Sequence, residues 1–114
     1  MKGMVYNNGL LAGFIEKDKD GNYIFQYEDV YFTDKQYPPI SLTLPKTQKT
    51  YWSEKLFPFF YGLLSEGINK DIQCRLFKLD ENDDFTRLLL AAREDTIGAI
   101  TVKPADNEMF RMLY

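Results

Sequence analysis

The hydrophobic pattern of this chain changes its period near residue 57 and changes back near residue 98. Up to residue 44, apolar side chains mostly alternate with polar ones, the pattern of half-buried strands. From Phe57 onward they recur at helical spacing, and a short alternating run returns after Gly98. Strands, then helices, then one returning strand predict an α+β domain. Its mostly antiparallel sheet has about five short strands, packed on one side with about three helices.

Two turn signals divide the N-terminal part into hairpins. Asn8-Gly9 joins strands predicted over residues 3–7 and 10–17, because both residues tolerate the positive φ angles of a tight type I′ turn. In the first strand Val5 faces opposite to Met4 and Tyr6. Residues 18–22, Asp-Lys-Asp-Gly-Asn, lead into a strand over 23–27. This spacing resembles a calcium loop but lacks the later ligands and the closing glutamate, so we interpret it as a hairpin turn.

The middle of the chain is predicted to be mostly irregular. Residues 28–39 show no clear period. Residues 40–44 are predicted to form a central strand bounded by prolines, with Ile40, Leu42 and Leu44 on one face. Residues 46–55 are mostly polar and form the longest predicted loop.

The helical part is predicted to contain three helices. The first has Pro58 in its first turn and is broken or bent at Gly67. The second begins near Asn69, and Asp83 or Asp84 caps the third. Their apolar faces consist of Phe59, Phe60, Leu63 and Leu64, of Ile72 and Leu76, and of Phe85, Leu88, Leu89 and Ala92. Gly98 then opens a last strand over residues 99–102, which Pro104 ends.

The residue types argue against catalysis. The chain has no histidine, which is the commonest general base and a frequent metal ligand, and only one cysteine, Cys74. It also lacks the glycine-rich loops that hold phosphates. Four acidic residues form a cluster in which a metal-dependent hydrolase could hold an ion: Asp80, Glu81, Asp83 and Asp84. The cluster lies in a polar link between helices, where helix capping accounts for two of the four. We predict no catalytic residue, cofactor or metal, and a small metal-dependent enzyme is the least favoured alternative.

Charge and hydropathy exclude further classes of partner. The net charge of −3 argues against direct nucleic-acid binding, which needs a concentrated basic face. No apolar stretch approaches the roughly 20 residues of a membrane span, and the N-terminus lacks a signal-peptide core. A lone cysteine is compatible with a reducing compartment. We therefore expect a cytoplasmic protein that binds neither membrane nor nucleic acid.

Four sequence runs carry a family resemblance, and they occur in a fixed order. They are Val5 to Gly9, Pro39 to Pro45, Phe57 to Gly67, and Asp83 to Leu90 followed by Asp95 to Val102. Together they resemble the small N-terminal subdomain that precedes the kinase core in HipA-type toxins, over residues 3 to 104. One departure is Ser65, where that family usually has proline. The predicted domain spans residues 1–104.

The resemblance implies a function through binding. In split systems of this kind a HipS-like protein resembling the subdomain is the antitoxin of a separate HipA/HipT-like Ser/Thr kinase, beside a helix-turn-helix DNA-binding protein. The expected role is a non-catalytic regulator that docks where a fused subdomain would sit and restrains the kinase. The alternative is the N-terminal structural subdomain of a full-length HipA-type kinase toxin.

Candidate site residues follow from this reading. Tyr51 and Trp52 lie in the middle of the predicted 46–55 loop, where Trp52 is either a core residue or, as we favour, an exposed anchor for the kinase. Glu66 matches a family motif and is a second partner-binding candidate. The resemblance implies structural roles for a further set: Asp84, Phe85, Asp95, Ile97 and Gly98.

The last residues, 105–114, leave the pattern of the domain. Five of them are too apolar for a free tail: Met109, Phe110, Met112, Leu113 and Tyr114. We expect this tail to dock on its own domain, on a second copy in a homodimer, or on a partner.

Overall fold

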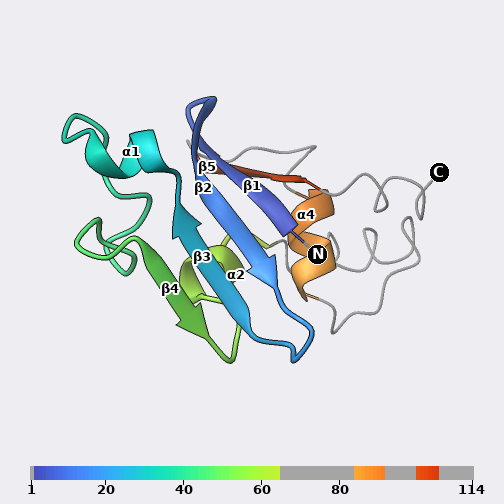
Figure 1. Ribbon diagram of the computed structural model, residues 1–114. Coiled ribbons are helices and arrows are strands. Elements are labelled where there is room, and N and C mark those ends of the chain that lie inside the picture. Colours follow the sequence, from blue (N-terminus) through green and yellow to red (C-terminus); the bar gives the residue numbers. More distant parts are fainter. Residues whose placement is uncertain (1, 65–83, 92–99, 106–114) are drawn as a thin grey trace.

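The computed structural model describes residues 2–64, 84–91 and 100–105, and these form a five-stranded antiparallel sheet with three helices (Figure 1). The strands are β1 (Lys2–Asn7), β2 (Leu10–Lys17), β3 (Tyr23–Tyr27), β4 (Thr50–Ser53) and β5 (Ile100–Pro104), in the order β4-β3-β2-β1-β5. The helices are α1 (Asp29–Thr33), α2 (Pro58–Tyr61) and α4 (Asp84–Ala91). The predicted α+β class is confirmed.

The two N-terminal turns have the predicted chemistry. Asn8 and Gly9 both adopt positive φ angles, 51° and 82°, as a type I′ turn requires. In the second turn Gly21 has a φ of 84°, and a carboxylate oxygen of Asp18 accepts the backbone N–H groups of Asp20 and Asn22, each at 2.9 Å. The aspartate therefore closes a hairpin turn, as interpreted from the sequence.

A β-bulge interrupts the pairing of β1 with β2. Val5 lies opposite Gly13 and Tyr6 opposite Leu11, so Ala12 is an extra residue on β2. Its carbonyl oxygen accepts the backbone N–H of Glu28 at 2.8 Å, which ties the start of α1 to the bulge. A Cβ at Gly13 would lie 2.5 Å from the carbonyl oxygen of Gln26, so only glycine fits there.

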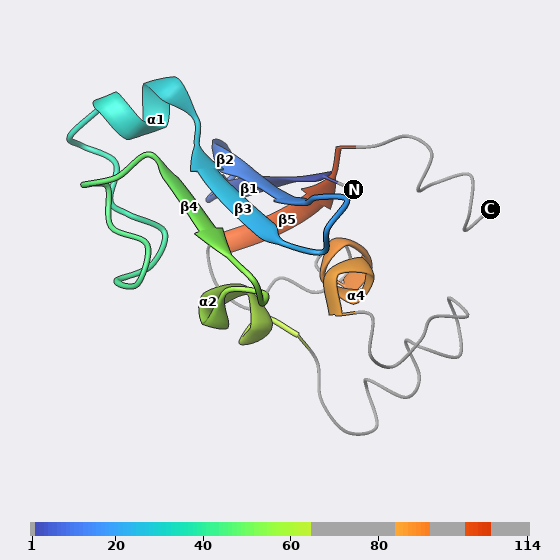
Figure 2. The same cartoon turned by 60° about the horizontal axis from the view of Figure 1, so that its bottom comes forward.

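The core lies between one face of the sheet and the helices α2 and α4, which both lie on that side (Figure 2). Phe25 of β3 contacts Phe60 of α2, with ring centroids 5.7 Å apart. At the other end Gly3 of β1 faces α4, where an added Cβ would lie 2.5 Å from Leu89 Cδ2. We call this side the inner face.

The predicted central strand over residues 40–44 is wrong. The segment forms a turn in which the backbone N–H of Leu44 donates to the carbonyl of Ser41 at 3.1 Å. Ile40 and Leu44 are buried on either side of the turn, whereas Leu42 is 95% exposed at its tip. The alternation of apolar residues therefore comes from a turn anchored at both ends.

The fourth strand lies instead within the predicted 46–55 loop, as β4. Thr, Tyr and Trp all favour a pleated surface, but four residues between polar neighbours give little periodicity. Pairing with β3 decides their conformation, since Phe25 lies opposite Tyr51 and Ile24 opposite Trp52.

The 28–39 segment also differs from prediction, because it begins with the short helix α1. Glu28 is its N-cap, and the carboxylate accepts the backbone N–H of Tyr31 at 3.0 Å. Tyr31 is buried and its ring stacks on that of Tyr27, which fixes the helix against the end of the sheet.

The later elements agree with prediction where they are described. α2 begins at Pro58 and α4 at Asp84, and β5 ends at Pro104, two residues beyond the predicted end of that strand. The helix expected near Asn69, the break at Gly67 and the apolar tail lie outside the described residues. After β5 the backbone N–H of Ala105 donates to the carbonyl of Lys2 at 2.9 Å.

Candidate partner-binding surface

Tyr51 and Trp52 are neighbours on β4 and point to opposite faces of the sheet. Tyr51 lies on the inner side, and its hydroxyl donates to the carbonyl of Pro45 at 2.6 Å. Trp52 lies on the other side, beside Ile24, and is 58% exposed. A core position for Trp52 is thereby excluded, and its indole sits on a hydrogen-bonded strand rather than on a loop.

Side-chain hydrogen bonds fasten the segment between α1 and β4 to the sheet. Tyr27 holds both sides of the 41–44 turn, since its hydroxyl donates to the carbonyl of Leu44 and accepts the backbone N–H of Ile40. The hydroxyl of Tyr31 donates to the carbonyl of Pro38 at 2.6 Å. The Lys46 ammonium donates to the carbonyls of Asp34 and Tyr37, at 2.6 and 2.8 Å.

The fold changes the ionisation of Tyr27. Burial raises the pKa of the Tyr27 phenol from 10.0 to about 12, although the Ile40 N–H that it accepts acts in the opposite direction. The neutral phenol is the form that can donate to Leu44 while accepting from Ile40.

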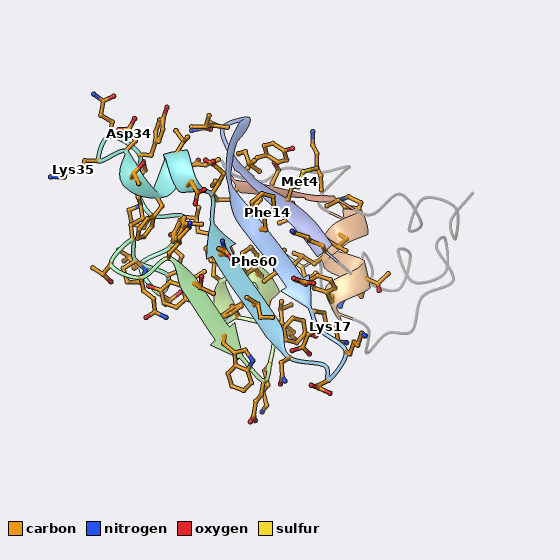
Figure 3. All side chains as sticks on the ribbon, viewed as in Figure 1. Met4, Phe14, Lys17, Asp34, Lys35 and Phe60 are labelled. Atoms are coloured by element: carbon orange, nitrogen blue, oxygen red, sulfur yellow. The ribbon has the colours of Figure 1, made fainter. Side chains whose placement is uncertain are left out.

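The face of the sheet opposite the core carries a group of apolar side chains. Six apolar side chains occupy its outward positions, and we call them the open face: Met4, Tyr6, Leu11, Phe14, Ile24 and Trp52. Their strands pair Met4 with Phe14 and Tyr6 with Leu11, so each pair shares a face. Figure 3 shows Met4 and Phe14 side by side on β1 and β2.

The described helices leave the open face uncovered. α2 and α4 lie on the inner side (Figure 2), and Tyr31 of α1 packs on Tyr27 and Asn7 at the end of the sheet. Each of the six side chains retains some solvent exposure.

A separate hollow of about 570 Å³ opens where the 18–22 turn, the end of β4 and α2 meet. Its lining includes the apolar or aromatic residues Tyr23, Leu56, Pro58 and Tyr61 and the charged residues Glu54 and Lys55. A mostly apolar lining with one charge of each sign suits a peptide side chain better than a phosphate group.

The candidate residues in the second half of the chain are only partly visible. Phe85 is fully buried, with its ring centroid 5.7 Å from that of Tyr23, which fits a structural role. Asp84 begins α4. The others lie outside the described residues: Glu66, Asp95, Ile97 and Gly98. The same holds for most of the acidic cluster, and within residues 2–64, 84–91 and 100–105 no three potential metal ligands come together.

Comparison with known proteins decides the family. The model of the HipA N-terminal domain matches residues 4–103 of this chain. The chain belongs to the HipA N-terminal domain family. A solved HipA N-terminal domain, described as that of HipA toxin, superposes with a TM-score of 0.66 at 29% identity and covers 93% of both chains.

Relatives of this HipA N-terminal domain occur in two sizes. A protein called putative kinase Y4mE from Sinorhizobium fredii is 29% identical over 104 residues, which are 91% of this chain but 24% of that protein. An uncharacterized protein from Haemophilus influenzae is 34% identical over 101 residues, 89% of this chain and 90% of that protein. The chain thus spans about a quarter of the first relative and nearly all of the second.

Sequence reasoning missed several residues of this HipA N-terminal domain surface. It placed Leu42 on a strand face, did not predict the hydrogen bonds of Lys46 to the carbonyls of Asp34 and Tyr37, and did not identify the open face as a unit. The alternation of Met4, Val5 and Tyr6 shows two apolar sides to β1, but only the strand register reveals that the outward side continues across β2 to β4.

No described helix is long and apolar enough to cross a membrane.

Proposed function

We propose that this domain is a non-catalytic regulator that binds a separately encoded HipA-like Ser/Thr kinase and restrains its activity. Membership of the HipA N-terminal domain family carries the proposal. The Haemophilus influenzae relative adds support, because a protein made almost wholly of this domain can act on a kinase only in trans.

The proposed mechanism is occlusion. The domain docks where a fused N-terminal subdomain would sit, and an exposed side chain limits access to the kinase cleft or its closure. Trp52 suits this role, because it is largely exposed and its strand is paired to β3. A large aromatic residue on a fixed backbone loses little conformational entropy on docking.

An alternative function is structural, with the domain acting within one polypeptide beside its kinase core. The putative kinase Y4mE favours this alternative, since the matched region is a quarter of that protein. The gene neighbourhood distinguishes the two functions, because the regulator requires a neighbouring open reading frame that encodes a kinase core without this domain.

Co-expression with that neighbouring kinase, followed by size-exclusion chromatography, tests the proposal. We expect a 1:1 complex that buries roughly 1,600 Å² and a kinase whose autophosphorylation falls when the domain is added. A helix-turn-helix protein encoded beside them would be added as a third component. Separate elution of domain and kinase at micromolar concentration would contradict the proposal.

A further inference from the structure

The open face departs from the usual composition of an antiparallel sheet. When one face of such a sheet packs on the core and the other faces water, the outward positions are normally polar. Here six outward positions on β1 to β4 are apolar. Met4 pairs with Phe14, Tyr6 with Leu11, and Ile24 with Trp52. Across β2 and β3, Phe14 lies opposite Gln26 and Ile24 opposite Glu16, so Phe14 and Ile24 are diagonal neighbours on this face. Apolar side chains gathered on one uncovered face mark an interaction surface more often than scattered ones do.

Charge is distributed unevenly across this face. Its charged outward positions on the five strands are Lys2, Lys103 and Glu16, an excess of one cation in a chain whose net charge is −3. Lys2 Nζ lies 4.7 Å from the ring centroid of Phe14, and Lys103 Nζ lies 5.4 Å from that of Tyr6. Both ammonium groups are thus held on β1 and β5 beside the apolar side chains, while Trp52 lies on the opposite edge strand.

We infer that the open face receives an amphipathic helix of the partner kinase, whose apolar side lies on Met4, Phe14 and Ile24 and whose carboxylates lie over Lys2 and Lys103. This inference rests on the proposed function and assigns it a surface. Helices cover the apolar face of the sheet in α+β domains, as α2 and α4 do on the inner face.

Binding by single-site variants tests the apolar part of the inference. Phe14→Lys and Ile24→Lys should each raise the Kd for the co-purified kinase by about 30-fold or more, as loss of a central contact does. The matched control is Leu42→Lys, which adds the same charge to an apolar residue that is 95% exposed on the 41–44 turn. It should leave the Kd within about threefold of wild type, and thermal melts confirm that all three variants fold.

A charge-reversed pair tests the electrostatic part. Lys2→Glu with Lys103→Glu should slow association by about tenfold at 50 mM salt, and the difference should disappear near 500 mM. In a separate measurement, a photo-crosslinking benzoylphenylalanine at position 14 should capture the kinase, and the same probe at position 42 should not.

The outcomes distinguish this inference from the proposed function. If wild type binds the kinase but Phe14→Lys and Ile24→Lys bind as tightly as Leu42→Lys, the open face is not the docking surface and the proposed function stands. If wild type does not bind at all, both fall. Concentration-dependent self-association that Phe14→Lys abolishes would assign the face to a second copy and overturn the inference.

Discussion

Trp52 shows how a short strand can present an aromatic side chain to solvent. Its neighbour Tyr51 is held from the inner side by Pro45, and its cross-strand partner Ile24 lies on the open face. The indole is therefore fixed at its base while most of its surface faces solvent.

Trp52→Ala tests whether that exposure serves binding. Because Trp52 is 58% exposed, we expect the free energy of unfolding to fall by about 1 kcal/mol, well below the 3–5 kcal/mol of a core aromatic. Kinase affinity should fall by about 30-fold or more. Denaturant titration and calorimetry measure the two quantities, with Leu42→Ala, at an apolar residue that is 95% exposed, as the control that keeps its affinity. A mutant that loses binding only because it unfolds would refute the anchor role.

Tyr27 is the residue on which the 41–44 turn depends. Tyr27→Phe removes the partner of the Ile40 N–H and the Leu44 carbonyl, so we expect a loss of about 1–3 kcal/mol in urea titrations. Tyr61→Phe removes a hydroxyl from a residue that is 48% exposed and should change stability by less than about 0.5 kcal/mol.

The same hydroxyl makes stability sensitive to alkali. The unfolded phenol ionises near pH 10, whereas the folded one does so near 12, so over this window the unfolded state binds fewer protons and stability falls as the pH rises. The contribution is complete below pH 10 and is lost through pH 12. The stability gap between wild type and Tyr27→Phe should therefore narrow between pH 9 and pH 12, and a constant gap would contradict the raised pKa.

At the scale of elements, the sequence predicted those whose determinants are local. The hairpins from residue 2 to 27 follow from Asn8-Gly9 and the 18–22 turn, and α2 follows from Pro58, because these residues restrict their own backbone. The exchange of a strand at 40–44 for one at 50–53 has a non-local cause. Buried Tyr27 binds both sides of the 41–44 turn, and β3 supplies the pairing partner of β4.

A pair of substitutions distinguishes the turn from the strand predicted there. Leu42→Ser should leave the free energy of unfolding within about 0.5 kcal/mol of wild type, because that side chain is 95% exposed. Leu44→Ala should cost about 2–5 kcal/mol, because that residue is 2% exposed. In a strand with both residues on one face the two costs would be similar, and equal losses in a denaturant titration would refute the turn.

The β-bulge depends on one glycine. Gly13→Ala places a Cβ 2.5 Å from the carbonyl oxygen of Gln26 and 3.0 Å from the Phe25 ring, so we expect a loss of about 1–3 kcal/mol from overpacking. Gly62 follows α2 with a φ of −65°, and an added Cβ there would meet nothing closer than 3.5 Å. Gly62→Ala should therefore be neutral or slightly stabilising. A melting temperature that falls equally in both variants would show that steric fit at Gly13 is not the cause.

The candidate partner-binding surface was harder to predict from the sequence than the helices and strands. Family motifs indicated the domain, and aromatic composition indicated Trp52 as an anchor. The open face depends on relations between strands: whether Phe14 adjoins Met4, and which side α2 and α4 cover, is settled only by register and packing. The assignment of Glu66 as a partner-binding candidate rests on its sequence motif alone.

Across the whole molecule, the sheet is a meander of four sequential strands closed by one distant strand. Val5 pairs with Val102 near the other end of the chain, and both are fully buried. Local pairing costs less loop entropy than distant pairing, so we expect β1, β2 and β3 to associate before β5 joins.

Folding kinetics test this order. Val102→Ala should cost about 2 kcal/mol and should act mainly by speeding unfolding, roughly thirtyfold, with little change in the folding rate. Ile15→Val lies in the middle of the meander and should cost less stability than Val102→Ala. Most of that loss should appear as a lower folding rate. A stopped-flow chevron gives both rates, and a Val102→Ala variant that folds several times more slowly would place closure of the sheet in the transition state.

The place of β5 has a consequence during biosynthesis. A ribosome makes β1 well before β5, so the strand that covers the free edge of β1 is completed only at Pro104. Until then a nascent meander exposes an unpaired edge beside Gly3 and Val5, and chains growing side by side on one messenger can pair through it. A partner that acts on the finished domain arrives too late to prevent this. The timing of translation over the last strand therefore sets how long each new molecule stays open to its neighbours.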